Sequence, residues 1–378
     1  MRLLHSRARD EGQSWAQIVR HWLPNWRWAA LRIAERVLTG GEIVAQTRHH
    51  WVEGSIDSGA HVISRSTSSP IEVREPEVLV WGATGERRSV PDPYVSETRY
   101  TYRLRDVVVD PGTGVPWTPE GVVLGEVNQF GVDPRWTDVA LEWSKKPRLK
   151  HSGKWMICAP NQSNYYHFLV EELPALLSSL SAVGGESVEI VGVCRDSRVH
   201  AWLRELQIPW TQIPRATVQC ERYIVSGRRF QTPSSRDWEL LKGLDVLKPT
   251  GVSPSRGAEK IFLSRLGYSR QIRWEGALID RLRSQGWFIF DGAEWTLREQ
   301  RQIFDGAKLV AGFAGAALAN IVWMRPESRI VCLSPPDPSH GFLWDRLAAL
   351  SGAEYSVCDV SAGDSLAGAW QTLQYAFG

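Results

Sequence analysis

The chain has 378 residues, a length that suits two domains, and its 43% hydrophobic and 23% charged residues are typical of a globular protein. Its 44 basic and 42 acidic side chains leave a formal net charge of +2, so no long-range field draws the chain to nucleic acid. The five cysteines include no CxxC pair, which argues against a zinc site or a disulfide framework and favours a reducing, cytoplasmic compartment.

The predicted elements begin with a basic helical segment over residues 1–41. Apolar positions recur at helical spacing over residues 13–38, with a break or kink at Pro24, and arginines and tryptophans are interleaved among them. This mixture is typical of a helix at a membrane surface, which would place the protein peripherally at the inner face of the plasma membrane. The alternative is a helix packed against the body of the protein. We predict no membrane span, because the sequence contains no run of about 20 apolar residues.

The rest of the chain divides into three predicted parts. Residues 42–149 hold short β-rich runs between Gly, Pro and Asp turns, which predict an antiparallel β region. Strands and helices alternate over residues 150–255 and again, after a polar linker, over residues 256–378. Two such blocks predict an α/β protein with two Rossmann-like lobes of parallel sheet that face each other across a cleft.

The first candidate site follows a predicted strand near residue 158. His167 lies near the start of the next helix, and Glu171 is four residues on, on the same helical face. A histidine oriented by a carboxylate can act as a general base. Asn164 and Tyr165, in the preceding loop, are candidates to bond an acceptor or a phosphate. The alternative is that His167 only caps and packs the helix.

The second candidate site is a basic loop. Arg265, Arg270 and Arg273 follow the predicted strand that begins at Lys260. Ligands of α/β folds bind at the carboxyl ends of parallel strands, and guanidinium groups can hold a diphosphate through paired hydrogen bonds. The alternative is a solvated basic loop.

The third candidate site is a strand that runs into Gly312 and Gly315 before a helix starts. Small residues let the backbone approach a phosphate closely, and the N–H groups of a helix start favour an anion. The alternative is that the small residues serve tight packing between strand and helix.

The sequence contains no Asp-x-Asp motif, which is typical of metal-dependent sugar transferases. Together with two lobes, this predicts a reaction without a metal, in which arginine and a helix dipole balance a leaving diphosphate.

The three segments together resemble glycosyltransferase family 61, which includes many bacterial capsular-polysaccharide-type proteins, over about residues 150–335. The positions that carry the resemblance are Asn164, Tyr165, His167, Glu171, Leu173 and Pro174; Ser264, Arg265, Arg270 and Glu275; Glu299 and Gln300; and Gly312, Gly315, Ala316, Leu318 and Asn320.

The resemblance implies a GT-B-like fold and an inverting hexosyl or pentosyl transfer from a nucleotide-sugar co-substrate to a glycan or lipid-linked glycan, without a cofactor, in surface polysaccharide biosynthesis. His167 is then the candidate base and Glu171 the residue that orients it. The acceptor lies on the first lobe and the donor on the second. The candidate nucleotide-sugar-binding residues are Asn164, Arg265, Arg270, Gly312, Gly315, Ala316 and Asn320.

Two positions depart from the family pattern. The family histidine before Gly-Ala is Ala314 here, and an acidic residue that often follows in the next strand falls at Cys332. Both replaced groups are expected to touch the donor. A second hypothesis is therefore a non-catalytic relative that binds glycan or a partner glycosyltransferase through the same cleft.

Overall fold

The computed structural model describes residues 61–66, 77–80, 99–117, 148–227, 233–248, 258–268, 272–333 and 341–359, and residues 366, 370 and 373–374. The basic helix predicted over residues 13–38 lies outside the described residues, and so does Arg270.

The first of two sheets is mixed and, within the described residues, has eight strands. Its main path runs β1-β3-β9-β6-β7-β8, while β4 pairs with β3 and β5 pairs with β9. Strand β3 pairs antiparallel with β1, β4 and β9. The remaining pairs, β5 with β9, β6 with β9, β6 with β7 and β7 with β8, are parallel. The strands are β1 (His61–Ser66), β3 (Arg99–Asp110), β4 (Val115–Trp117), β5 (Arg148–His151), β6 (Trp155–Cys158), β7 (Val188–Gly192), β8 (Thr211–Gln212) and β9 (Thr217–Ser226).

The second sheet is wholly parallel and, in the described part of the chain, has six strands in the order β11-β10-β12-β13-β14-β2. Its central strands are buried on both faces, as β12 illustrates with five buried residues in a row. The strands are β10 (Lys260–Leu263), β11 (Phe288–Phe290), β12 (Leu309–Phe313), β13 (Arg329–Leu333), β14 (Glu354–Asp359) and β2 (Glu77–Val80).

The β-rich region predicted over residues 42–149 contributes to both sheets. Its strands β1, β3 and β4 pair antiparallel, as predicted, but they extend the first sheet through β9. Strand β2 instead joins β14 in the second sheet and runs parallel to it. The domain boundaries drawn from the sequence stay predictions.

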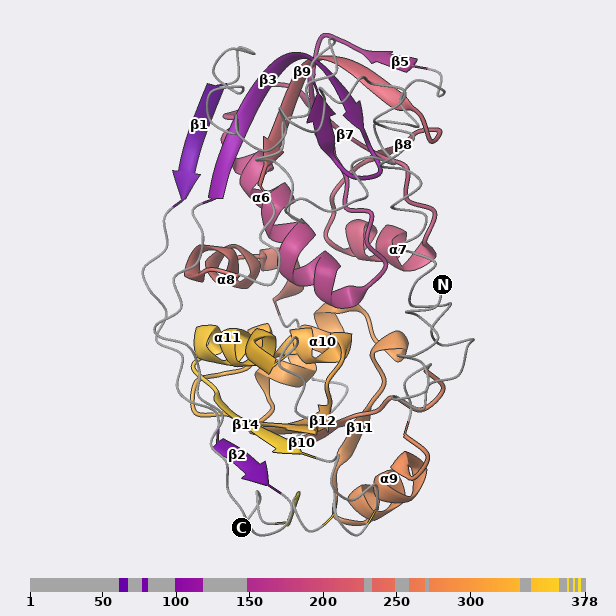
Figure 1. Cartoon of the computed structure of the whole chain (residues 1–378), viewed down its shortest axis with the longest axis vertical. Coiled ribbons are helices and arrows are strands. Elements are labelled where there is room, and N and C mark those ends of the chain that lie inside the picture. The colour runs from indigo at the N-terminus through magenta and orange to yellow at the C-terminus, as the bar shows by residue number, and fades with distance from the viewer. Residues whose placement is uncertain are drawn as a thin grey trace, which may run out of the picture.

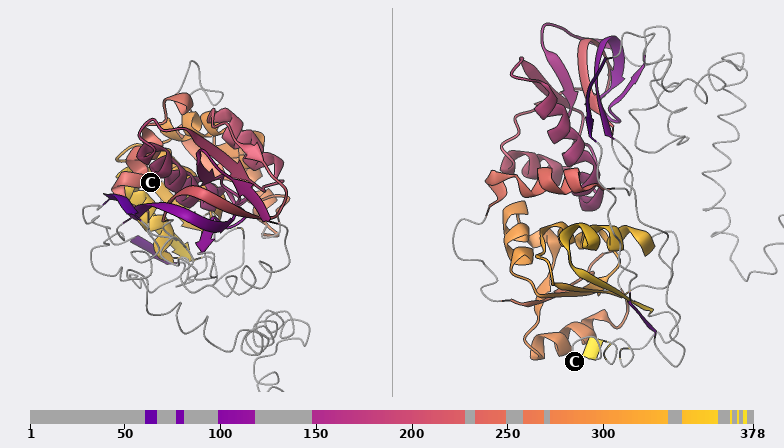
Figure 2. Two further views of the ribbon diagram at one scale, coloured as in Figure 1. Left: turned by 90° about the horizontal axis from the view of Figure 1, so that it is seen from above. Right: turned by 90° about the vertical axis from the view of Figure 1, so that its left-hand side faces the viewer.

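Helices fill the space between the two sheets. Figure 1 shows α6, α7 and α8 on the inner side of the first sheet, with α10 and α11 opposite them on the second sheet; both Figure 1 and Figure 2 place α9 beyond that sheet. The α-helices are α6 (Leu173–Ala182), α7 (Ser197–Glu205), α8 (Ser235–Lys242), α9 (Glu275–Ser284), α10 (Leu297–Asp305) and α11 (Gly341–Ser351). Short helical turns of other types are η2 (His167–Glu172), η3 (Asp245–Leu247), η4 (Gly292–Glu294) and η5 (Ala316–Trp323).

Local signals in the sequence set several helix ends. Thr296 and Glu299 form a capping box at the start of α10: the Thr296 side chain accepts from the Glu299 backbone N–H, and the Glu299 carboxylate accepts from Thr296 N–H. Gly286 follows α9 with a φ of 78°, the left-handed conformation that ends many helices. The prediction of an α/β protein with parallel sheet is confirmed.

One hydrophobic core runs through the helical layers between the sheets. It includes Phe168 and Leu173 from the first half and Phe304 and Trp323 from the second, all fully buried. Polar contacts join the same layers: Lys242 Nζ donates to the Trp323 carbonyl over 3.1 Å at the end of η5. The two halves are therefore packed together through shared apolar surface and capped helix ends.

Candidate active site

The first candidate site lies where the first sheet changes direction. Strand β6 stands between β9 and β7, and the chain continues from β6 through α6 to β7 on one side before it returns to β9 on the other. Such a point, outside the carboxyl ends of the strands, is where α/β folds bind ligands. The loop after β6 carries Asn164, which is exposed, and its Oδ1 accepts from the backbone N–H of Tyr166 over 3.0 Å.

A π-helical turn, η2, places the predicted catalytic residues. The sequence predicted an ordinary helix here, but the Leu173 N–H bonds the carbonyl of Phe168, five residues earlier. Pro174 explains the wider turn, because it has no N–H and its ring would clash with the carbonyl of Val170 in an α-helix. Single π-helical turns inside α-helices are frequent at functional sites.

The structure shows the predicted contact between His167 and Glu171. His167 Nδ1 lies 2.8 Å from Glu171 Oε2, with 26% of the histidine side chain exposed and the glutamate fully buried. A buried carboxylate at Nδ1 holds the imidazole in one orientation. Their catalytic roles stay predictions.

Sequence reasoning missed the role of Glu172. Its side chain is 3% exposed, and Oε2 accepts from the backbone N–H groups of Asn161, over 2.8 Å, and Gln162, over 2.9 Å. A charged acceptor on two backbone donors holds the loop before His167 in place. The available signal was a second carboxylate beside Glu171 in an otherwise apolar helical stretch.

The second and third candidate sites come together at the switch point of the second sheet. Strand β10 lies between β11 and β12, and the chain visits β11 through α9 before it crosses to β12 through α10. Arg265 follows β10 and Gly315 follows β12. A Cβ atom built on Gly315 would lie 3.6 Å from Arg265 Nε, so the guanidinium lies against the backbone at the start of η5. The predicted phosphate-binding groups are thus neighbours.

A buried glutamate supports the Arg265 loop. Glu275 begins α9, its side chain is fully buried, and its Oε1 accepts from the backbone N–H of Arg265 over 2.5 Å. This bond fixes where the Arg265 side chain starts.

The structure supports a packing role for Gly312. A Cβ atom there would stand 2.6 Å from the Cβ of Leu263 on the neighbouring strand, closer than real side chains approach. The sequence predicted a helix start after Gly315, and the structure has a 3-10 helix from Ala316, in which Leu318 N–H donates to the Gly315 carbonyl over 2.9 Å. Contact of Gly312 or Ala316 with a donor stays a prediction.

Asn320 links the two halves instead of lying open to solvent. It is fully buried, its Oδ1 accepts from the Tyr165 hydroxyl over 2.8 Å, and its Nδ2 donates to Gln300 Oε1 over 2.9 Å. Burial raises the pKa of Tyr165, so the phenol stays protonated and donates. The first and third candidate sites therefore meet through a bond between residues 155 positions apart.

The two positions that depart from the family pattern lie directly after β12 and within β13. Ala314 follows β12, and its N–H donates to the Leu333 carbonyl over 3.3 Å. Cys332 is 1% exposed and lies in β13 opposite Gly312. A buried thiol at this position offers little polar contact to a ligand.

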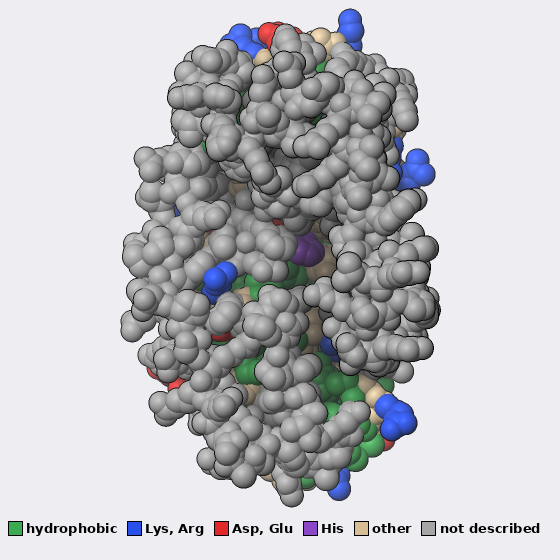
Figure 3. All heavy atoms as spheres, viewed as in Figure 1, with side chains coloured by type: hydrophobic (Ala, Val, Ile, Leu, Met, Phe, Trp, Pro, Cys, Tyr) green, Lys and Arg blue, Asp and Glu red, His purple; other side chains and the backbone are tan. Residues whose placement is uncertain are grey.

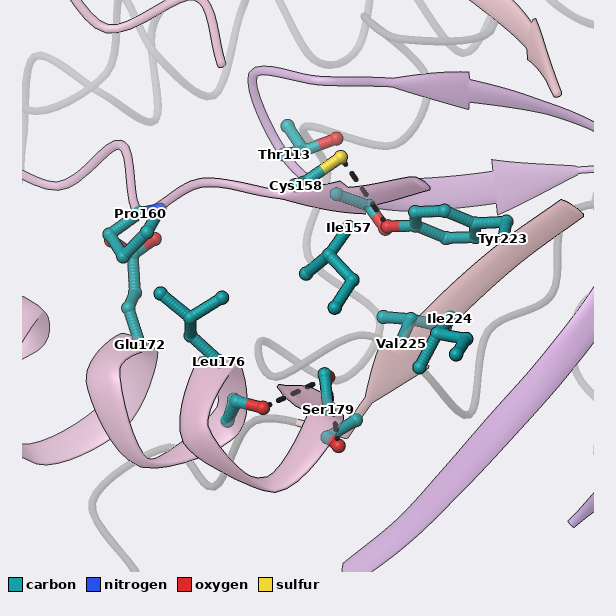
Figure 4. Close-up of a pocket in the computed structure, with 13 residues that line it drawn as sticks. Thr113, Ile157, Cys158, Pro160, Glu172, Leu176, Ser179, Tyr223, Ile224 and Val225 are labelled. Carbon is teal, nitrogen blue, oxygen red and sulfur yellow. Dashed lines mark hydrogen bonds between the residues drawn. The ribbon is translucent and has the colours of Figure 1, made fainter. Parts of the chain in front are cut away.

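In the space-filling view a histidine side chain and a group of hydrophobic side chains are visible at the middle of the face seen in Figure 1 (Figure 3). A separate small pocket of about 30 Å³ lies between the first sheet and α6, where Glu172, Ser179 and Tyr223 line it (Figure 4). It has room for one water molecule, which is too little for a sugar. A surface hollow of about 400 Å³ contains no predicted site residue and is lined by His200, Arg204, Gln207, Ile208, Pro209 and Trp210.

Within the described residues, three or more His, Cys, Asp or Glu side chains nowhere gather as they would around a metal ion. The helices in the same part of the chain are too short or too polar to cross a membrane.

The chain was compared with known proteins and with models of protein families. No curated protein matches the chain. A family model does match, over residues 165–331, a segment that holds His167, Arg265, Gly315 and Asn320. The matching family is Glycosyltransferase 61, and the match supports glycosyltransferase family 61 for this segment and a glycosyltransferase activity for the chain.

Proposed function

We propose that the chain is an inverting, metal-independent glycosyltransferase of GT-B type that moves a sugar from a nucleotide-sugar to a glycan or glycoconjugate acceptor. The observation that carries the proposal is the position of Arg265 beside Gly315 at the switch point of a parallel sheet, inside the segment that matches the family model. A cation and a helix start meet there, which suits the diphosphate of a nucleotide-sugar.

On the donor side, Arg265 binds the diphosphate oxygens and the N–H groups at the start of η5 face the same charge. As the bond between the anomeric carbon and the diphosphate oxygen breaks, negative charge grows on the leaving group. Hydrogen-bond donors that already point at this position stabilise the growing charge more than they stabilise the bound nucleotide-sugar. Arg270 is proposed to add a second cation from outside the described residues.

On the acceptor side, His167 takes the proton of the attacking hydroxyl. The hydroxyl oxygen forms the new bond to the anomeric carbon from the side opposite the diphosphate, so the configuration inverts. Nε2 receives the proton, while the buried Glu171 carboxylate at Nδ1 stabilises the imidazolium that forms. The bond between Tyr165 and Asn320 ties this side of the site to η5.

The wider setting of the reaction also stays a proposal. A hexosyl or pentosyl transfer in surface polysaccharide biosynthesis, in the cytoplasm or peripherally at the inner face of the plasma membrane, suits the family and the tryptophan- and arginine-rich residues 13–38. Liposome flotation of the full chain against a chain that starts near residue 40 tests the membrane contact.

A second candidate is a non-catalytic relative that binds glycan or a partner glycosyltransferase. Ala314 and the buried Cys332 favour it, because both stand where the family carries polar groups. The intact contact between His167 and Glu171 favours catalysis.

A thermal-shift screen with UDP-, GDP-, CMP- and dTDP-sugars, followed by a turnover assay with the donor that binds, separates the two. We expect stabilisation by one donor class and turnover that persists in excess EDTA, since arginine and backbone N–H groups balance the diphosphate. Turnover lost in EDTA and restored by manganese would contradict the metal-independent reaction. Glycan binding without turnover of any donor would favour the second candidate.

A further inference from the structure

Two large hydrophobic side chains stand out from the surface of the described residues, and both lie in one turn. Leu266 is 41% exposed and Tyr268 is 43% exposed. The turn directly follows Arg265 at the carboxyl end of β10. This apolar pair, open to solvent beside a cation, lies at the carboxyl end of a parallel strand, which is where α/β folds bind ligands.

The Tyr268 ring is held in place although it is exposed. Tyr268 N–H donates to the Arg265 carbonyl over 3.1 Å, and Gly267 turns the chain with a φ of 82°. The Tyr268 hydroxyl donates to Asp291 Oδ1 over 2.6 Å, and the same oxygen accepts from Ala293 N–H over 3.0 Å. A ring fixed at both ends can stack on a ligand without losing much further freedom.

The side chains of Arg265 and Tyr268 lie beside the two different strands that flank β10. Arg265 lies against Gly315, after β12, and Tyr268 is bonded to Asp291, after β11. Strands in a sheet are about 4.8 Å apart, so the ends of β11 and β12 are separated by about 10 Å. That span suits a nucleoside diphosphate whose phosphates lie at Arg265 and whose base lies at Tyr268.

The electrostatics of the turn keep the tyrosine neutral. Burial and the hydrogen bond to Asp291 raise the pKa of Tyr268 to about 12, against a smaller opposite effect of Arg198 on α7. Arg198 is itself paired with Asp196 over 2.8 Å. A neutral phenol ring with a neighbouring cation accepts a flat, uncharged partner such as a nucleobase.

We propose that the turn from Arg265 to Tyr268 is the nucleobase subsite of the donor, where the base stacks on the Tyr268 ring and contacts Leu266. This inference rests on the proposed function, since it extends the diphosphate contact of Arg265 along the same loop. Sugar rings also stack on aromatic side chains, so an acceptor sugar at Tyr268 is the rival outcome. The acceptor is expected at His167, on the other half, which favours the base.

The test is isothermal titration calorimetry of the full chain with UDP, GDP, CDP and dTDP, and with inorganic pyrophosphate. The variants are Tyr268→Ala, Tyr268→Phe and Arg265→Ala. Tyr268→Ala should weaken the best nucleoside diphosphate about 5- to 150-fold, the loss expected for one stacked base, and leave pyrophosphate affinity unchanged. Tyr268→Phe keeps the ring and loses only the bond to Asp291, so the loss should stay within a few-fold.

The outcomes separate this inference from the proposed function. If Arg265→Ala weakens binding and Tyr268→Ala does not, the donor site stands and the base subsite is wrong. Normal nucleotide affinity of Tyr268→Ala with a raised acceptor KM would assign the ring to the acceptor and overturn the inference. If the wild-type chain binds none of the nucleotides, both the donor site and its base subsite are wrong.

Discussion

Arg265 lies against the backbone of Gly315: a Cβ atom added at position 315 would stand 3.6 Å from its Nε and 3.7 Å from its Cζ. These are ordinary contact distances, and the φ of Gly315 is −179°, an extended conformation open to any residue. Neither the backbone conformation nor the space for one methyl group therefore requires glycine at position 315, whereas a larger side chain would meet the guanidinium.

We expect Gly315→Ala to fold and to keep donor binding, because one methyl group fits beside Arg265. Gly315→Val should fold equally well but displace the guanidinium and weaken nucleotide binding. Gly312→Ala is the contrasting variant: its Cβ would stand 2.6 Å from that of Leu263, so we expect a loss of about 1–3 kcal/mol in the free energy of unfolding. Calorimetric affinities and urea unfolding curves measure the two effects separately. Loss of folding in Gly315→Val would contradict this interpretation.

Arg265→Ala should weaken donor binding by about 1.5–3 kcal/mol, the contribution of a hydrogen bond to a charged group. Arg329→Ala is the matched control. Arg329 begins β13 at the amino ends of the strands of the same sheet, away from Arg265, and half of its side chain is exposed. The affinities of both variants for the donor that binds the wild-type chain are compared by titration. An unchanged affinity in Arg265→Ala would remove this residue from the donor site.

His167→Ala should lower kcat by about 10²–10⁴-fold and leave donor affinity nearly unchanged, as expected for loss of a general base. The variant leaves Glu171 buried without its imidazole partner, so His167→Gln serves as a second variant that keeps a polar contact without a base. Both are assayed at equal folded concentration, measured by circular dichroism. A folded variant with full activity would exclude His167 from the mechanism. Activity that falls only in step with folded protein would mark a structural role.

Tyr165→Phe removes the bond to Asn320 and leaves a buried amide oxygen without that donor. We expect unfolding to become easier by about 1–3 kcal/mol. Tyr223→Phe is the matched control, since the Tyr223 hydroxyl is also buried and donates to the Gly114 carbonyl over 2.8 Å within the first half. Both variants should lose stability, but only Tyr165→Phe should lower turnover, because it alone loosens His167 from η5. Equal turnover in the two variants would show that the link serves stability alone.

Local rules predicted the features that depend on neighbouring residues. Alternating strand and helix patterns predicted the succession of strands and helices from β6 to β13. The contact of His167 with Glu171 followed from their spacing. Each of these depends on at most a few residues in sequence.

Features that depend on distant residues were out of reach. The bond from Tyr165 to Asn320 joins residues 155 positions apart, and nothing in the local pattern marks Asn320 as a buried link. The π-helical turn depends on Pro174, whose effect on a preceding turn is a kink, an end or a widening according to the packing around it. Strand pairing in β2 is decided by tertiary context in the same way.

The pairing of β2 with β14 also bears on how the chain folds as it is made. Residues 77–80 leave the ribosome well before their partner at 354–359, because the chain is made from its N-terminal side. The second sheet therefore stays open along one border until residues 354–359 have been made, and closing so long a loop is slow. A chain that lacks residues 1–80 would leave unpaired the backbone groups of β14 that bond β2. An unpaired strand of this kind recruits other chains into aggregates.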